Sequence, residues 1–542
     1  MMMYETATDA VVVDCGVLFP SADEPGVDRI IPDISYVLRQ RHKLRAFILT
    51  HAHEDHIGAL PLVLRHLGEH AEAPIFATAF TLAMLRAKFA EYPQCTPDLR
   101  QIEDGLPFVV AGLTVTPLAV THSIPGCVAL ALETPVGVVV HTGDFKLDPR
   151  PLDGRLTDEG GLRRLGDAGV AVLLSDSTNA LREGCSESEQ VVRETLFDLI
   201  AQAPERVVVS TFASNIHRLQ SIVDASIRCG RVVFPLGRSL QRNIRLALDV
   251  GALRAPFGGI ADTRDTSDLG HRARREVTIV ASGCQGEPRS AMSCLAVGDF
   301  PGVTVDAGDR VILSSRRIPG NERAVGTLVN NFLRRGMQVI EDGRACVHTS
   351  GHGFQGEMRR MLELCRPSAF VPLHGELRHM LAHAALAREA GVSPENVFVV
   401  EDGTSLVFVR EGATLRGSYG EPVRAGLVFV AGTGAGGVGA GEVGQDVLRE
   451  RRVLAQGGVV FCALRVSSDA GGRVAITGCG LAHEDDGKGS TPLREAHLLA
   501  EKALHEAHHD DVEGQRLAVQ TTLTRYFRQN NSRQPLVIVV WV

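Results

Sequence analysis

Six consecutive residues hold four possible metal ligands. His51, His53, Asp55 and His56 stand in the string HAHEDH, directly after the apolar run LRAFILT and before the amphipathic run HIGALPLVLRHL. This pattern predicts a strand, a tight turn and a helix, with the four side chains projecting from the turn. Zinc prefers imidazole nitrogen and carboxylate oxygen. The cluster therefore predicts a zinc site, although a single histidine elsewhere is more often a surface or core residue.

Further ligands are expected where other strands end. His122 follows GLTVTPLAVT, Asp144 follows GVVVHTG, and His374 follows SAFVPL. The expected ligands are His51, His53 and His122 for a first ion, Asp55, His56 and His374 for a second, and Asp144 for both. Two zinc ions about 3.5 to 4 Å apart can hold a bridging hydroxide and neutralise a phosphate under attack. The sequence thus predicts hydrolysis with two Zn²⁺ per chain, and Mn²⁺ or Mg²⁺ are alternatives for activity.

Two acidic residues near the cluster have other expected roles. Asp14 ends the first strand, VVVDCG, and could orient a histidine or the turn. A plain strand-terminal aspartate is an equally good interpretation. Glu54 lies between the ligands, so its side chain should point away from them and form a structural hydrogen bond.

Short β-branched runs alternate with helical stretches through most of the chain, which indicates layered α/β domains. Polar clusters end most of these runs, so polar groups should gather at one edge of the sheets. The string AGTGAGGVGAGEVG reads as a flexible connector. The expected parts are a split α/β domain in residues 1–187 and 344–424, an α/β insertion in 188–343, a linker in 425–454 and a small α/β domain in 455–542.

Charge is distributed unevenly along the 542 residues. The chain has 56 Lys plus Arg and 64 Asp plus Glu, a net charge of −8, which argues against coating nucleic acid by bulk electrostatics. Residues 188–343 contain 20 Arg, no Lys and 17 acidic residues, so this segment carries 20 − 17 = +3. Arginine favours bidentate phosphate contact, although a coding bias toward arginine explains the count equally well.

Composition also bears on location. No apolar run reaches the roughly 18 residues that span a bilayer, and MMMYETATDA lacks the features of a signal peptide. The eleven cysteines never form a CxxC pair, which suits reduced thiols and makes thiolate-bound zinc unexpected. We therefore expect a cytoplasmic protein with no membrane partner.

Several strings resemble one known family. HAHEDH, His122, Asp144 and the strand-end HGE resemble the metallo-β-lactamase superfamily. SDSTN with Asp176, SGHG with His352 and PLHGE resemble the three motifs of its β-CASP nuclease branch. LFPSADEPGVDRIIPD, TFASNIHR, GCQGEP and IPGNE are similar to ribonuclease J, and the resemblance covers nearly the whole chain. It implies a four-layer αββα metallo-β-lactamase fold with an inserted α/β β-CASP domain and a small C-terminal α/β domain that aids dimerisation.

The resemblance also implies an activity. Ribonuclease J enzymes cut RNA internally and from the 5′ end during rRNA processing and mRNA decay, so RNA is the expected partner, as 5′-monophosphorylated single strands. A homodimer or homotetramer is expected. By position, His352 would protonate the leaving group or bind the scissile phosphate, and Asp176 would support it by a hydrogen bond near the metals. Imidazole, with a pKa of about 6.5, can supply that proton at neutral pH.

Two segments are expected to contact substrate phosphate. The matching family loops imply His348, Thr349, Ser350, Gly351 and His352 in one segment and Ala213, Ser214 and Asn215 in the other. The first segment precedes the amphipathic run GEMRRMLELC, so its amides should lie at a helix N-terminus, which receives phosphate readily. A glycine turn that caps the helix is compatible with the same sequence.

The chain departs from the family pattern at three places. It opens with MMMYETATDA immediately before VVVDCG, so a first strand and its glycine loop are expected to be missing, and one sheet would lack an edge strand. A misassigned start codon would explain this. Cys284 replaces a common serine, and Arg316 and Arg317 replace a more apolar pair, which could alter how RNA is held.

Three other functions remain open from the sequence. A DNA-directed β-CASP nuclease would share every ligand, since RNA and DNA differ by 2′-hydroxyl contacts that spacing does not reveal. A small-ester hydrolase, such as a thioesterase, would not need the basic insertion or the SGHG loop. A catalytically silent RNA-binding subunit could keep the fold, but it would not need the full set of ligands. The balance of internal and 5′-end cutting is not predictable.

Overall fold

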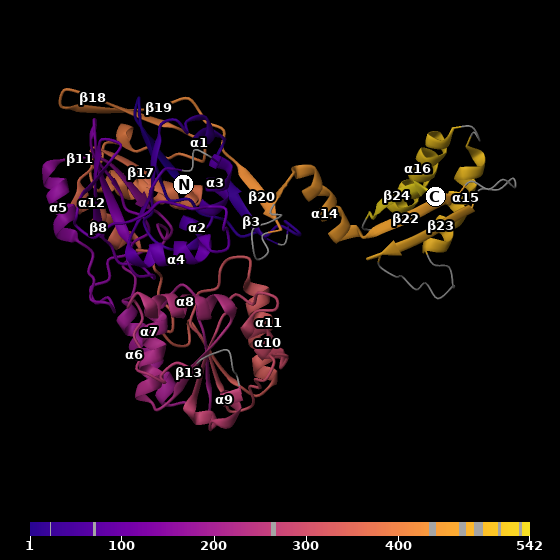
Figure 1. Ribbon diagram of the computed structural model, residues 1–542, viewed down its shortest axis with the longest axis horizontal. Coiled ribbons are helices and arrows are strands. Elements are labelled where there is room, and N and C mark those ends of the chain that lie inside the picture. Colours follow the sequence, from indigo (N-terminus) through magenta and orange to yellow (C-terminus); the bar gives the residue numbers. More distant parts are fainter. Residues whose placement is uncertain are drawn as a thin grey trace. The chain divides into compact units, whose positions relative to one another are not determined.

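The computed structural model describes residues 1–21, 23–68, 72–261, 267–432, 441–465, 473–481, 492–507, 511–530 and 534–542. The chain divides into two compact units. The first comprises Met1–Val17 and Pro32–Gly426, and the second comprises Leu18–Ile31 and Leu427–Val542. Within the first unit, a lobe built on two sheets, called the sandwich lobe, is interrupted by an inserted α/β lobe (Figure 1).

The sandwich lobe contains a five-stranded and a six-stranded sheet. The first has the order β1 (Met2–Glu5), β2 (Ala10–Val13), β4 (Leu44–Ile48), β5 (Ile75–Ala77) and β6 (Leu99–Gln101). The second has the order β17 (Ala369–Leu373), β11 (Val170–Asp176), β10 (Gly137–His141), β9 (Val128–Thr134), β8 (Leu113–Ala119) and β7 (Phe108–Val110). Residues of both sheets, such as Val11 and Ile48 from one and Leu130 and Leu174 from the other, form one buried core.

Helices cover the outer sides of this sandwich. The helices on the outer face of the first sheet are α1 (Ser35–Arg39), α2 (Glu54–Ile57), α3 (Leu60–Leu67) and α4 (Ala79–Phe89). On the other side are α5 (Glu159–Ala168), α12 (Gln355–Cys365) and α13 (Leu377–Glu389), of which α5 contacts β11 and α13 contacts β17. The hairpin β18 (Leu406–Glu411) and β19 (Thr414–Tyr419) and the short helix η3 (Pro394–Asn396) follow. The expected four-layer αββα fold is confirmed.

The first sheet ends in a strand, β1, that the sequence did not predict, while the expected loss of the family's first strand and glycine loop stays a prediction. β1 pairs antiparallel with β2, with Met2 opposite Val13 and Glu5 opposite Ala10. Alternate residues Met2 and Tyr4 pack on the core between the sheets. MMMYE therefore supplies the amphipathic strand, and comparison with a longer family start concealed that alternation.

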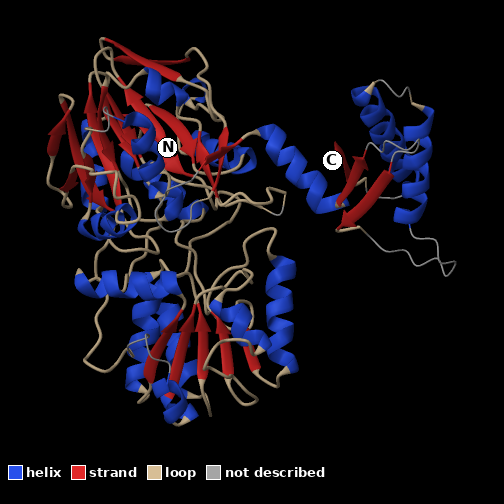
Figure 2. Cartoon of the chain, turned by 45° about the vertical axis from the view of Figure 1, so that its right-hand side comes forward, coloured by secondary structure: helices blue, strands red, loops and turns tan. Residues whose placement is uncertain are grey.

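The inserted lobe is a parallel sheet between helices. Its strand order is β13 (Val232–Leu236), β14 (Val277–Ala281), β12 (Val207–Ser210), β15 (Arg310–Leu313) and β16 (Gln338–Glu341), and Figure 2 shows these strands side by side in one direction. Its helices are α6 (Glu189–Ala201), α7 (Ile216–Arg228), α8 (Arg238–Asp249), α9 (Ser267–His271), η2 (Arg274–Glu276), α10 (Ala291–Val297) and α11 (Glu322–Arg334). The β-branched strands are buried on both faces, as parallel strands between helices require.

The second unit has two small sheets. β21 (Gly441–Val443), β20 (Leu427–Ala431) and β3 (Arg29–Pro32) form one, and Val27, Phe429 and Leu448 share its core. Helix α14 (Gln445–Gly457) leads to β23 (Arg473–Cys479), β22 (Val459–Arg465) and β24 (Leu536–Trp541), which pack with α15 (Pro492–Glu506) and α16 (Val512–Asn530). The described parts of the expected linker, 425–454, are thus strands and a helix that return to the early segment 18–31. Residues 433–440 of the glycine-rich string lie outside the described residues.

The helices and the cysteines bear on the expectations about membrane spans and disulfides. Among the described helices, none combines the length and apolar character needed to cross a bilayer. All eleven cysteines are free thiols, as expected from their spacing.

A buried ion pair lies where the inserted lobe connects to the sandwich lobe. Arg218, on α7, is 0% exposed and forms a bidentate pair with Glu189, at the start of α6. The same guanidinium donates to the Ser314 carbonyl at 3.1 Å and to the Val347 carbonyl at 2.9 Å. Val347 belongs to the segment that returns to the sandwich lobe. One side chain therefore ties together the outgoing segment, the inserted sheet and the returning segment.

Replacing Arg218 with Ala should lower the free energy of unfolding by about 3–5 kcal/mol, because Glu189 would stay buried without its partner. Urea denaturation followed by circular dichroism measures this loss. Arg359→Ala is the matched control, since Arg359 pairs with Glu389 at an exposed site. Equal stability of the two variants would contradict the assigned role of Arg218.

Candidate metal centre

The predicted turn lies between β4 and α2. His53 precedes α2 with an extended backbone (φ −69°, ψ 150°), so Asp55 and His56 fall in the first helical turn. Asp14 holds both ends of this segment. Its carboxylate accepts hydrogen bonds from the Thr50 amide at 2.8 Å and from His56 Nδ1 at 2.7 Å. Asp14 therefore orients His56 and the turn, and it is not merely the last residue of a strand.

His51, His53, His122 and Asp144 form the first group of possible ligands, with ligand atoms all within 4.8 Å of one another. The Nε2 atoms of His51 and His122 each lie 3.1 Å from Nδ1 of His53. His51 Nδ1 contacts the Thr50 hydroxyl at 2.9 Å.

The hydrogen bonds of this group leave a place for a cation. The Thr50 hydroxyl donates its hydrogen to Asp14, so its oxygen accepts a hydrogen bond from His51 Nδ1–H. His122 Nδ1 donates to the Gly351 carbonyl at 2.6 Å. Both Nε2 atoms consequently present lone pairs to His53 Nδ1, which can offer one proton at most. A metal ion among the three nitrogens satisfies all of them, so the donor set fits zinc.

The second group contains Asp55, His56, Asp144 and His374, again within 4.8 Å. His56 Nε2 is buried without a hydrogen-bond partner and lies 3.1 Å from Asp144 Oδ2. His374 Nδ1 lies 3.5 Å from Asp144 Oδ1. Asp144 Oδ2 also lies 3.6 Å from His51 Nε2 of the first group, so this one carboxylate reaches both groups, as a shared ligand must.

The electrostatics of His56 also favour a cation. Burial alone would lower its pKa, but the carboxylates of Asp144 and Asp14 raise the pKa of His56 to about 10. Burial likewise lowers the pKa of His53 to about 4, so that imidazole stays neutral and can donate a lone pair. Without a metal, a proton on His56 takes the place of the positive charge that the carboxylates attract.

A third possible ligand group contains Asp144, Asp176, His352 and His374. Asp176 Oδ1 already accepts from the Thr178 amide at 2.9 Å and hydroxyl at 2.7 Å, and Oδ2 contacts His352 Nδ1 at 2.8 Å. Because these contacts occupy the Asp176 oxygens, the carboxylate is better suited to orienting His352 than to binding a metal. His352 lies beside the expected ligands, with its ring 4.9 Å from that of His122.

The segment with His348, Thr349, Ser350 and Gly351 lies next to this centre. Asn179 donates to the Ser350 hydroxyl at 2.9 Å and to the His352 carbonyl at 3.1 Å. Thr349 is buried and donates to the Glu187 carbonyl, so its side chain is structural. A Cβ at Gly351 would lie 2.7 Å from His122 Cε1, so only glycine fits there. The segment directly precedes α12, as expected.

The second expected phosphate segment, Ala213 to Asn215, lies at the start of α7. Asn215 is buried and caps this helix by accepting from the Arg218 amide at 3.0 Å. The Ala213 carbonyl accepts from Asn243 at 3.0 Å. The two segments meet through Arg218, whose guanidinium donates to Val347, the residue before His348. The Asn215 side chain is thus used as a cap, and Ser214 is partly exposed.

Some supporting residues were not predicted individually. Thr178 contacts His374 Nδ1 at 2.9 Å as well as Asp176, and its place in SDSTN is the signal that could have identified it. Tyr4 contacts His141 Nδ1 at 2.8 Å across 137 residues, for which the sequence gives no signal. The expected hydrogen bond of Glu54 is confirmed, because Lys88 donates to both of its carboxylate oxygens at 2.7 and 2.8 Å.

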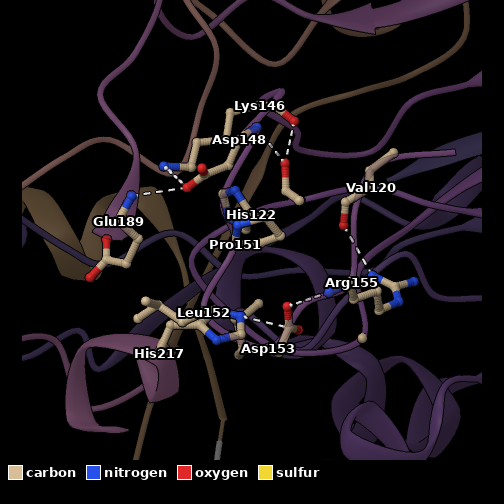
Figure 3. A pocket seen from close by; sticks show the side chains of 13 residues that line it. Val120, His122, Lys146, Asp148, Pro151, Leu152, Asp153, Arg155, Glu189 and His217 are labelled. Atoms are coloured by element: carbon tan, nitrogen blue, oxygen red, sulfur yellow. Dashed lines mark hydrogen bonds and ion pairs between the residues drawn. The ribbon is translucent and has the colours of Figure 1, made fainter. Parts of the chain in front are cut away.

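A cavity of about 20 Å³ lies behind His122, between the sandwich lobe and α7 (Figure 3). Its wall contains charged residues, including the pair Lys146 and Asp148 at 3.2 Å and His217 near Asp153 at 3.8 Å. This volume holds about one water molecule, so the cavity is too small for a substrate.

Comparison with known proteins agrees with this geometry. Four family models match: "Beta-lactamase superfamily domain" at residues 11–173, "Ribonuclease J, beta-CASP domain" at 204–332, "Zn-dependent metallo-hydrolase RNA specificity domain" at 342–400 and "Ribonuclease J C-terminal domain" at 446–542. The fold and the ligand groups define the class of metallo-β-lactamase hydrolases that carry a β-CASP insertion.

Relatives that match nearly the whole chain show which family within this class it belongs to. Ribonuclease J of Mycolicibacterium smegmatis is 38% identical over 99% of this chain and 94% of its own length. Ribonuclease J of Thermus thermophilus is 34% identical over 98% of this chain and 90% of its own length. Ribonuclease J of Corynebacterium glutamicum is 38% identical over 99% of this chain and 73% of its own length. The chain belongs to the ribonuclease J family, which confirms the resemblance found in its motifs.

His53→Ala and Asp55→Ala should each remove metal from the purified protein and abolish hydrolysis, because each takes a ligand from one group. Mass spectrometry of bound metal, with circular dichroism to check folding, measures the effect. Glu54→Gln, in the same turn but directed at Lys88, should keep its metal. Wild-type metal content in both alanine variants would refute the ligand assignment.

Proposed function

We propose that this chain hydrolyses RNA phosphodiester bonds with two zinc ions, one held by His51, His53 and His122, the other by Asp55, His56 and His374, and both by Asp144. The observation that carries the proposal is the position of Asp144, whose oxygens lie 3.1 Å from His56 Nε2 and 3.5 Å from His374 Nδ1 while its Oδ2 is 3.6 Å from His51 Nε2. Zinc ions bound there would supply a water molecule of lowered pKa and neutralise charge on the phosphate.

His352 is the proposed proton donor. Burial would lower its pKa, but the Asp176 and Asp144 carboxylates raise the pKa of His352 above its ordinary value. A raised pKa increases the fraction of the imidazole that carries a proton at neutral pH. Asp176 holds Nδ1 at 2.8 Å, so Nε2 is the atom that can give a proton to the departing alkoxide. Thr178 and Asn179 keep the two sides of this pair in place.

The substrate is proposed to be single-stranded RNA, held by phosphate contacts from Ser350 and Gly351 beside the centre and from Ser214 at the start of α7. Supporting this choice are the matching RNA specificity domain model and the ribonuclease J relatives. We propose both internal and 5′-to-3′ cutting, with preference for a 5′-monophosphate, and assembly into dimers or tetramers. A DNA-directed nuclease and a silent RNA-binding subunit are the competing functions.

Parallel assays on matched RNA and DNA oligonucleotides, with 5′-monophosphate or 5′-triphosphate ends and products resolved by size, test the substrate. The proposal predicts that RNA is cut with metal present and that 5′-monophosphorylated RNA is cut fastest from its end. Faster cutting of DNA would favour the DNA-directed alternative, and binding of RNA without cutting would favour the silent subunit.

His352→Ala should lower kcat by roughly 10²–10⁴-fold while leaving metal content unchanged, because it removes a proton donor and not a ligand. The wild-type rate should fall as pH rises through the raised pKa of His352, since only the protonated imidazole can donate, and this fall should be absent from the variant. Single-turnover rates across pH and metal analysis provide the measurements. Parallel loss of metal and rate would show that His352 is structural or a ligand.

A further inference from the structure

Four basic side chains lower the pKa of His348 by their charge, and two of them are paired with carboxylates. Arg218 pairs with Glu189, and Lys146 pairs with Asp148 at 3.2 Å. Within the described part of the chain, the guanidinium groups of Arg182 and Arg316 form no ion pair or hydrogen bond. Two unneutralised positive charges therefore lie near the segment that precedes His352.

Arg182 is held in a defined place. It lies in the segment between β11 and α6, where its amide donates to Asn179 and its carbonyl accepts from Gln355, both at 2.9 Å. Its guanidinium carbon lies 5.2 Å from the centre of the Phe354 ring. Stacking on a ring fixes the guanidinium plane and leaves the N–H groups on its edge free to bind an anion.

Arg316 comes from the other lobe. It follows β15, and the Ser314 hydroxyl donates to the Val347 carbonyl at 2.6 Å, which joins this strand end to the residue before His348. Gln285 fixes the backbone around Arg316 by donating to the Arg316 carbonyl at 2.9 Å and accepting from the Ile318 amide at 2.8 Å. The Arg316 side chain itself is exposed.

The two charges are close enough to affect one another. Burial lowers the pKa of Arg182 most, and the charge of Arg316 lowers it further. The carboxylate of Asp342 acts in the opposite direction but forms no ion pair with Arg182. Burial, with Arg218, Arg316, Lys146 and Arg182, lowers the pKa of His348 to about 3, so His348 adds no charge at neutral pH. Like charges held together cost free energy, and an anion between them removes that cost.

We propose that Arg182 and Arg316, one from each lobe, together bind one phosphate group of a single-stranded RNA substrate. This inference rests on the proposed ribonuclease function. A phosphate matches the planar donor edge of a guanidinium, and an RNA strand that reaches the reaction centre passes the segment containing Ser350 and His352. Because the arginines belong to different lobes, the contact would also link both lobes to the strand.

Arg182→Gln, Arg316→Gln and the double variant test the proposal in the metal-loaded full chain. Each single change should raise KM for RNA on the order of tenfold with little change in kcat, because a charge-assisted contact is lost away from the bond that breaks. The KM of the double variant should rise by less than the product of the two single increases, since both side chains hold the same phosphate group. The slope of log(kcat/KM) against log salt should become shallower by about 0.7 in the double variant.

Arg317→Gln is the matched control. Its guanidinium is adjacent in sequence but already pairs with Glu341, so KM should stay within about twofold of wild type. Thermal unfolding midpoints of all variants should match. Oligonucleotides with a 5′-hydroxyl or a 5′-monophosphate identify which phosphate the two arginines bind. Equal increases in KM on both substrates assign an internal phosphodiester. An increase confined to the 5′-monophosphorylated substrate assigns the terminal phosphate.

The proposal fails if both single variants match wild type and Arg317→Gln in KM and salt slope while the wild type cuts RNA. A KM increase in the double variant equal to the product of the two single increases would also overturn the proposal, because each arginine would then bind a separate group. Fluorescence anisotropy of a labelled RNA oligonucleotide in chelator separates the two proposals. If the metal-loaded wild type binds RNA without cutting it, the ribonuclease proposal fails, and the affinities of the same variants measured in chelator still decide the role of the arginines.

Discussion

The Asp144 carboxylate lies 3% exposed, with Nε2 of His51, His56 and His122 at 3.6, 3.1 and 3.9 Å and Nδ1 of His374 at 3.5 Å. An isolated buried carboxylate is costly, and burial indeed acts to raise its pKa, but the surrounding imidazoles lower it below the ordinary range. The arrangement demands positive charge at its centre. Protons on the histidines can supply that charge, and two metal ions would supply it while using the imidazole lone pairs.

The rest of the sandwich lobe keeps these side chains in place. Asp14 fixes the turn through Thr50 and His56, and Gly351 fixes His122 through its carbonyl. Asp14 and His374 both have left-handed backbone conformations, with φ of 56° and 55°, which is unusual for residues other than glycine and common at functional sites. The inserted lobe is tied to the same region through Arg218, which donates to the Val347 carbonyl at the start of the returning segment 347–352.

Much of this candidate centre could be predicted because its possible ligands follow strands. Parallel strands bring their carboxyl ends to one edge, so His51, Asp144 and His374 could be grouped from sequence although they are far apart along the chain. Contacts that depend on packing could not. The Tyr4 to His141 contact, the stacking of Arg182 on Phe354 and the burial of Arg218 follow from tertiary arrangement alone. The strand in MMMYE and the pairing of residues 427–431 with 441–443 were not predicted, because family length and glycine content outweighed local alternation.

Anomalous X-ray diffraction at the zinc absorption edge, from crystals of the zinc-loaded protein, would locate the bound ions. We expect two peaks per chain on either side of the Asp144 carboxylate, one among His51, His53 and His122 and the other among Asp55, His56 and His374. A single peak, or a peak bound by Asp176 and His352, would contradict it.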